Sequence, residues 1–188
     1  MSEKYKTVDK EMGYFLTLTV VDWIYIFIQK NHKMKIVEAL KFCQENKGLE
    51  IFGYCLMSNH LHLSARAGGK QNLSEIIRDF KQFTSKGIIR QIKEEPETKK
   101  GRLLEQFELA GRGKKRIKKY KFWQDGNHAK LIFSPEVFYQ KLEYIHNNPV
   151  KAGLVKNPED YLFSSTRNYA GLTSYLDIIM ETPGLKTS

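Results

Sequence analysis

Two histidines separated by one residue, His60 and His62, lie in the segment HLHLSARA at 60–67. If this segment is a β-strand, both imidazoles point to the same face, because side chains alternate with a period of two. Two neighbouring imidazoles can share one divalent cation. A His-x-His pair considered alone is nevertheless more often a pair of surface or hydrogen-bonded histidines, and the spacing by itself favours that interpretation.

A phenol and an amide have helical spacing in the segment YIHNNPV at 144–150. Tyr144 and Asn148 are four residues apart, so they share one face of a helix that precedes Pro149. They could line one pocket. Taken alone, the simpler interpretation is that Tyr144 packs in the core, Asn148 caps the helix and Pro149 ends it.

Together, the two histidines, the amide oxygen and the tyrosine suit phosphodiester transfer. A cation held by two nitrogens and one oxygen keeps positions open for a phosphate oxygen, and it can act as a Lewis acid on that phosphate. Tyrosine has a pKa of about 10, so it is a weak nucleophile until a neighbour or a metal activates it. A phosphotyrosine ester conserves the energy of the broken bond, so rejoining would need no ATP.

The pattern of apolar residues predicts the elements that would position these groups. Strand-like segments are rich in β-branched and aromatic residues, and helical segments repeat apolar residues at helical spacing. Strands are expected at 14–21, 49–57, 60–67 and 131–133, a further extended run at 23–29, and helices at 33–46, 72–93 and from Ser134 to Pro149. This order predicts an α+β, ferredoxin-like fold, an antiparallel sheet with helices mainly on one face.

The length and composition indicate one domain, residues 1–188, with a charged, basic excursion at about 94–121. Thirty-one Lys and Arg against 21 Asp and Glu give a net charge of +10, which favours a phosphate-rich partner. Two cysteines are too few for a disulfide framework. No signal peptide is evident and no apolar run approaches the roughly 20 residues of a membrane span, so we expect a cytoplasmic protein without a membrane partner.

Three segments resemble those of the REP-associated tyrosine transposases, relatives of the single-tyrosine insertion-sequence transposases. NHLHL at 59–63 resembles their HUH motif, which is His, a bulky hydrophobic residue, and His. YIHNNPVKAGLV at 144–155, followed by NPEDYLFSSTRNY, resembles their C-terminal signature, and FWQDGNHAKLI at 122–132 resembles the block before their last helix. The similarity extends from about Tyr14 to Gly171, and the long C-terminal signature favours the catalytic interpretation of both residue sets.

The resemblance implies a site, a metal and a substrate. It makes His60 and His62 metal ligands, Tyr144 the nucleophile and Asn148 the third ligand, although insertion-sequence relatives carry Gln at that place. It implies the HUH variant of the ferredoxin-like fold, Mg²⁺ or Mn²⁺, and single-stranded DNA recognised beside an imperfect hairpin. The oligomeric state stays open, because relatives include homodimers with shared active sites and others that act alone.

The basic segment is the first candidate for contact with the DNA. Seven cations crowd positions 112–121 beside aromatic residues, which suits a single-strand platform where phosphates meet charge and bases stack. A solvated loop is the plainer alternative. The candidate DNA contacts are Arg112, Lys114, Lys115, Arg116, Lys118, Lys119 and Lys121, with Arg66 and Lys70 after the histidine segment. The roles of His128 and His146 stay open.

Four functions compete. The leading one is an active single-strand nicking and strand-transfer enzyme that works through a 5′-phosphotyrosine. The second is a domesticated protein that binds hairpin DNA without transposition. An RNA-binding ferredoxin-like module would leave the histidines idle and lacks the aromatic strand signature of an RRM. A hydrolase of small phosphoesters would have no use for the basic surface.

Overall fold

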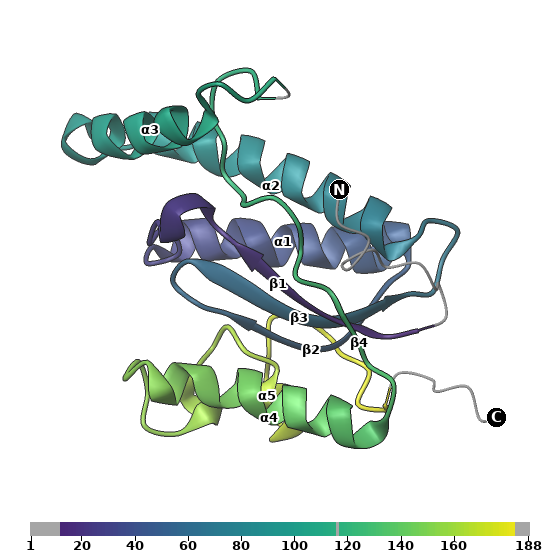
Figure 1. The fold of residues 1–188 in the computed structure, drawn as a ribbon. Coiled ribbons are helices and arrows are strands. Elements are labelled where there is room, and N and C mark those ends of the chain that lie inside the picture. Colours follow the sequence, from purple (N-terminus) through teal and green to yellow (C-terminus); the bar gives the residue numbers. More distant parts are fainter. Residues whose placement is uncertain (1–11, 116, 183–188) are drawn as a thin grey trace.

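The computed structural model describes residues 12–115 and 117–182 (Figure 1). Its strands are β1 (Tyr14–Thr19), β2 (Leu49–Leu56), β3 (His60–Ala67) and β4 (Lys130–Leu131). Its α-helices are α1 (Lys30–Lys47), α2 (Leu73–Glu94), α3 (Glu97–Gly111), α4 (Pro135–Lys151) and α5 (Thr166–Tyr169), and its 3-10 turns are η2 (Val21–Trp23) and η3 (Pro158–Asp160).

The four strands form one antiparallel sheet in the order β2-β3-β1-β4. This is the ferredoxin-like arrangement that the sequence predicted, with both central strands provided by β1 and β3. The edge strand β4 is short because only Lys130 and Leu131 pair with β1. The α+β class and the antiparallel sheet are thus confirmed.

Helices α1 and α2 cover one face of the sheet, and α3 lies beyond α2 (Figure 1). The strand residues facing α1 and α2 include Leu16, Leu18, Leu61 and Leu63, each with no exposed surface. Burying such side chains stabilises the fold by roughly 1.5–3 kcal/mol each.

Helix α4 lies on the opposite face of the sheet, so the helices are divided more evenly than "mainly on one face" implied (Figure 1). Its close approach depends on Gly53 in β2. A Cβ atom at Gly53 would lie 2.6 Å from Cδ1 of Leu142 and 3.4 Å from Cδ1 of Ile145. The glycine therefore lets α4 pack directly on the backbone of β2, on the face that also carries the histidines.

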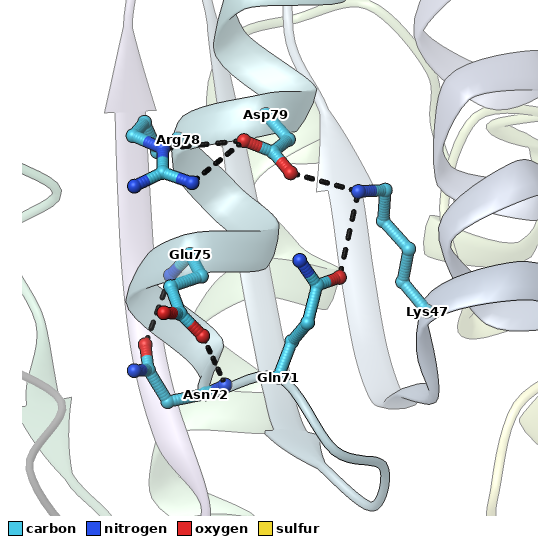
Figure 2. A network of polar contacts seen from close by, with 6 residues as sticks. All are labelled: Lys47, Gln71, Asn72, Glu75, Arg78 and Asp79. Atoms are coloured by element: carbon cyan, nitrogen blue, oxygen red, sulfur yellow. Dashed lines mark hydrogen bonds and ion pairs between the residues drawn. The ribbon is translucent and has the colours of Figure 1, made fainter.

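A polar network joins the end of α1 to the start of α2 (Figure 2). The side chain of Asn72 accepts from the backbone of Glu75, whose carboxylate accepts from the backbone of Asn72, as the capping box predicted from the sequence requires. Lys47 donates to Asp79 at 2.7 Å and to Gln71 at 3.4 Å. These contacts fix the direction in which α2 leaves the β3 strand.

Two expectations about local structure were wrong. Residues 23–29 do not form a strand: Asp22 and Trp23 have positive φ angles of 51° and 55°, and the chain then turns. Ile24, Ile26 and Phe27 are buried in this irregular segment, whereas Trp23, Tyr25 and Ile28 are exposed. The backbone N–H of Phe27 donates to the carbonyl of Ser58 and not to a neighbouring strand. Helix α4 does not stop at Pro149 but continues to Lys151, because a proline in the last turn removes only one helical hydrogen bond.

The excursion at 94–121 contains α3 and a basic loop. Phe107 of α3 is fully buried and stacks on Phe122 with 5.1 Å between ring centroids. The excursion is therefore attached to the core through its apolar patch. In the described part of the chain, no helix is long and apolar enough to cross a membrane.

Candidate active site

The two histidines of β3 lie side by side on the face covered by α4. Their Nε2 atoms are 3.1 Å apart, and their ring centroids are 4.6 Å apart. The partner of His62 across β1 is Thr17, and its partner across β2 is Cys55. The period-two spacing of the sequence therefore places both imidazoles on one face, as expected.

Asn59 fixes the orientation of His60. Its Nδ2 donates to the carbonyl of Trp23 at 3.1 Å, so its Oδ1 is the atom that lies 2.7 Å from Nδ1 of His60. A carboxamide oxygen can only accept, so Nδ1 of His60 carries the ring proton. Its Nε2 then keeps a free lone pair that points toward His62.

Thr17 lies behind His62, with its Oγ1 3.1 Å from Nδ1 of the imidazole. If His62 carries its proton on Nε2, it donates to His60 and accepts from the Thr17 hydroxyl. If the proton is on Nδ1, His62 donates to Thr17, and two Nε2 lone pairs then face each other. In that second arrangement, a cation between the two nitrogens would offset the repulsion of the lone pairs.

Burial keeps both imidazoles neutral. Desolvation, and to a lesser extent the neighbouring His60, lowers the pKa of His62 to about 3. Desolvation also lowers the pKa of His60 below its ordinary value. Both rings are therefore in the neutral form near pH 7, which is the form that binds metal ions.

The separation of the two Nε2 atoms fits adjacent ligands of one metal ion. Metal–nitrogen bonds of about 2.1 Å at a right angle place two ligand atoms about 3.0 Å apart. Among the described residues, no group of three or more His, Cys, Asp and Glu side chains could hold a metal. A third protein ligand would therefore have to be another kind of donor, such as an amide oxygen.

Helix α4 brings Tyr144 to the histidines. Its ring lies edge-on to His62 with 5.5 Å between centroids, and edge-on to Phe15 at 6.4 Å. Phe15 itself stacks on His62 at 5.6 Å. Tyr144 is 45% exposed, so it borders solvent and is not a core residue. Its own chain supplies the histidines it contacts, so this contact needs no second copy.

Asn148 follows Tyr144 by one turn of α4. Its Nδ2 is buried and has no hydrogen-bond partner within the described residues. Because a half-turn of the terminal torsion exchanges the amide nitrogen and oxygen, the same buried position suits a carboxamide oxygen that meets a cation. The Asn148 side-chain nitrogen therefore does not cap the helix, which was the simpler interpretation of the sequence.

Two lysines flank Tyr144 on the same helix. Nζ of Lys151 lies 5.8 Å from the centre of the Tyr144 ring, and Nζ of Lys141 lies 5.7 Å from the centre of the Phe15 ring. Residues 141, 144, 148 and 151 are spaced three or four apart, so they form one stripe along α4. The stripe places positive charge on both sides of the phenol.

The basic loop that follows α3 carries an exposed group of cations. Lys114, Lys115, Lys118 and Arg112 are exposed. Lys119 forms an ion pair of 3.6 Å with Glu108. Arg116 lies outside the described residues.

Lys121 differs from its neighbours in this segment, because it is buried and holds Asp125 at 2.5 Å. Lys81 of α2 donates to the carbonyls of Gln124 at 3.1 Å and Gly126 at 2.6 Å, and burial lowers its pKa to about 8. Both lysines hold the 121–126 turn in place. Lys121 therefore has a structural role, in place of the DNA contact that the sequence predicted.

The other candidate contacts lie elsewhere on the surface. Arg66 is on the histidine face of β3 but donates to Glu50 through both Nε and Nη2 and covers the ring of Phe52. Lys70 is exposed in the loop between β3 and α2. Arg66 is therefore already paired inside the protein.

The two histidines without an assigned role are separated by the fold. His146 lies within 2.8 Å of the Ser165 hydroxyl and packs on Tyr169, and burial lowers its pKa to about 4. It joins α4 to the C-terminal segment. His128 is exposed, with a positive φ of 44°, next to Asn127, whose carbonyl accepts from the backbone of Thr17.

Sequence reasoning assigned no role to the residues that support the site, although Asn59 belongs to the NHLHL motif. These residues are Phe15, Thr17, Asn59, Lys141 and Lys151. The spacing of the two lysines from Tyr144 was visible as a helical stripe. The contacts of Phe15 and Thr17 depend on the register of β1 against β3, which no local pattern specifies.

One family model matches part of this chain. Residues 24–107 match the family model described as "Transposase IS200 like", a stretch that runs from before α1 into α3 and includes His60 and His62. Over this segment the chain is similar to the IS200-like transposases. Tyr144 and Asn148 lie beyond the matched stretch. No curated protein matches the sequence.

A particular solved structure shares the whole fold. The structure of a REP-associated tyrosine transposase bound to a REP hairpin matches with a TM-score of 0.66 and 19% sequence identity, and the match covers 100% of this chain and 99% of that one. This match confirms the fold that the resemblance to the REP-associated tyrosine transposases implied.

Proposed function

We propose that this protein nicks and rejoins single-stranded DNA beside a hairpin, with Tyr144 as the nucleophile. The observation that carries the proposal is the contact between Tyr144 on α4 and His62 on β3, two residues 82 positions apart (144 − 62) that the fold brings to a 5.5 Å ring contact. The basic charge of the chain and the likeness to a hairpin-bound transposase support DNA as the substrate.

The reaction is a transesterification. The phenol oxygen of Tyr144 attacks phosphorus, the bond from phosphorus to the 3′ oxygen breaks, and the leaving oxygen takes up a proton as the phenol loses one. The products are a 5′-phosphotyrosine and a free 3′-hydroxyl. Attack by a DNA 3′-hydroxyl on the phosphotyrosine reverses the step, restoring the phosphodiester and releasing Tyr144.

The residues around Tyr144 would orient the DNA. Lys141 and Lys151 lie on either side of the phenol, where ammonium groups can bind the phosphates that flank the scissile bond. Phe15 holds the Tyr144 ring against His62, which limits the directions the phenol oxygen can take. Positioning of this kind raises the rate because the nucleophile need not search for the phosphorus.

His60, His62 and Asn148 would hold a divalent cation, and Mg²⁺ or Mn²⁺ is the proposed metal. Such an ion supplies Lewis-acid polarisation of a phosphate oxygen when bound. The neutral imidazoles, the 3.1 Å gap between their Nε2 atoms and the buried amide of Asn148 support this assignment. Asn59 would hold the His60 tautomer that leaves Nε2 free, and the Thr17 hydroxyl would accept from Nδ1 of His62 in the matching tautomer.

The test is a covalent adduct. The protein is incubated with Mn²⁺ and a hairpin that has unpaired flanks, labelled at either its 5′ or its 3′ end, and run on a denaturing gel. We expect the 3′ label to move with the protein and the 5′ label to appear on a shorter free strand. Tight hairpin binding without either product would favour the domesticated DNA-binding protein instead.

Replacing Thr17 with Val tests the proposed control of the His62 tautomer. Valine has nearly the same shape but cannot accept from Nδ1 of His62, which lies 3.1 Å from the threonine hydroxyl. Loss of such a supporting hydrogen bond typically weakens metal binding about 10- to 100-fold. Thr17→Ser, which keeps the hydroxyl, is the matched control. Equal Mn²⁺ requirements in titrations of wild type, Thr17→Ser and Thr17→Val would contradict this role.

The exposed loop lysines give a separate prediction about binding. Changing Lys114, Lys115 and Lys118 to Ala removes three exposed cations. If each engages a phosphate, the log-log salt dependence of hairpin binding should flatten by up to about 2 units, roughly 0.7 per contact. Sequence preference should change little, because phosphate contacts carry no base information. Binding titrations at several salt concentrations measure this slope.

The control for the loop variant removes Lys41 and Lys156, which are exposed on other elements. We expect its salt slope to match that of the wild type. Parallel salt lines for the loop variant and the wild type would mean that the loop is merely solvated. The DNA path would then run past Lys141 and Lys151 instead.

A further inference from the structure

A groove beside the histidine pair is lined by aromatic, aliphatic and polar side chains. It lies between the segment after β1 and helix α3, and its cavity volume is about 620 Å³. Its walls include Trp23, Tyr25, Ile28, Arg102 and Gln106. That volume is within the roughly 300–1,000 Å³ of pockets that hold small molecules.

The aromatic side chains of this groove face solvent. Trp23 is 57% exposed and Tyr25 is 66% exposed, so neither serves as core. Large exposed aromatics with a nearby guanidinium, here Arg102, are the groups on which unpaired nucleobases stack.

The backbone holds Trp23 in an unfavourable conformation. Asp22 and Trp23 have φ angles of 51° and 55°, a region that residues other than glycine rarely occupy. Asn59 secures the turn by donating to the carbonyl of Trp23 at 3.1 Å. Strained backbone of this kind persists where surrounding contacts enforce it, and it is common at functional sites.

The groove is continuous with the candidate active site. The Trp23 ring lies edge-on to His60 with 6.2 Å between centroids, and Asn59 contacts both residues. A base stacked on Trp23 would therefore lie next to a phosphate positioned at the histidines.

We propose that this groove, with Trp23 and Tyr25 as its stacking surfaces, binds unpaired nucleotides of a DNA strand next to the scissile phosphate. The inference rests on the proposed function for the identity of the strand. It adds a subsite for bases, separate from the exposed lysines of the 112–118 loop. Bases would stack on the two rings while Arg102 faces the strand from α3.

Intrinsic fluorescence can test the groove without any catalysis. The chain has two tryptophans, and the other one, Trp123, is buried. The variant Trp123→Phe leaves Trp23 as the single reporter, and Trp23→Phe leaves the buried one. Both are titrated in EDTA with a short single-stranded oligonucleotide. Stacking predicts strong quenching when Trp23 is the reporter and little when Trp123 is.

Affinity provides the second arm. On a hairpin with unpaired flanks, Trp23→Ala should weaken binding by about 5- to 100-fold, the range expected for loss of base–aromatic stacking. Trp23→Phe should restore most of it. On a hairpin without flanks, Trp23→Ala should bind as the wild type does. The control is Phe83→Ala, which removes an equally exposed aromatic from α2 outside the groove.

The outcomes separate this inference from the catalytic proposal. Quenching of Trp23 in a protein that forms no adduct would support the groove and contradict the nicking activity. Adduct formation with no quenching of Trp23, or equal losses for Trp23→Ala on flanked and unflanked hairpins, would overturn the groove and leave the nicking activity intact.

Discussion

Replacing His60 or His62 with Ala is expected to abolish adduct formation and leave hairpin binding largely unchanged. Each imidazole is proposed to supply one of two adjacent ligands, and their Nε2 atoms lie only 3.1 Å apart. One remaining imidazole cannot hold the cation in the same place. Asn148→Ala should reduce activity less, because water can replace one neutral oxygen ligand of a hard cation.

The control for the histidine variants is His146, a half-buried histidine. His62 is 4% exposed, so its loss also costs stability, roughly 1–3 kcal/mol for an unpaired buried partner. His146→Ala removes a histidine that contacts Ser165 and lies outside the site. It should lower the melting temperature comparably while adducts still form. Full adduct yield from His60→Ala, or from wild type in excess EDTA, would refute the metal assignment.

Tyr144→Phe is expected to fold normally, bind the hairpin and form no adduct. The ring is 45% exposed, and within the described residues no hydrogen bond reaches its hydroxyl. The variant therefore keeps the contacts with Phe15 and His62 while losing only the nucleophilic oxygen. The loss should exceed that for any other single change, because no group replaces a covalent nucleophile. A denaturing gel with 3′-labelled DNA measures it.

Tyr139→Phe is the matched control for Tyr144→Phe. Tyr139 lies on the same helix and is similarly exposed, but its ring contacts Phe138 and not the histidines. Its substitution should leave adduct yield near that of the wild type. An adduct from Tyr144→Phe that disappears in Tyr139→Phe would show that the neighbouring tyrosine is the nucleophile.

Local periodicity predicted which of the candidate site residues share a face, whereas their catalytic interpretation came from the resemblance. A spacing of two on a strand places His60 and His62 together, and a spacing of four on a helix places Tyr144 and Asn148 together. These rules hold because they follow from backbone geometry alone. That Tyr144 meets His62 depends on α4 packing on β2 at Gly53, a contact between segments nearly 90 residues apart. Only the resemblance to a known family indicated this contact from the sequence.

Local patterns failed where long-range packing overrides propensity. Residues 23–29 look like a strand, yet the chain turns at Asp22 and Trp23, and those apolar side chains form a groove wall. Lys121 looks like its basic neighbours in sequence, but it is buried against Asp125. Neither outcome follows from composition, because each depends on which distant segment covers the residue.

The central claim, that Tyr144 becomes covalently attached to DNA, can be tested most directly by peptide mapping of the wild-type adduct. Trypsin cuts after Lys130, Lys141 and Lys151, so Tyr139 and Tyr144 fall in different peptides, 131–141 and 142–151. After nuclease trimming, mass spectrometry should find the added nucleotide on peptide 142–151. The same mass on peptide 131–141, or on neither peptide while adducts form, would contradict the account.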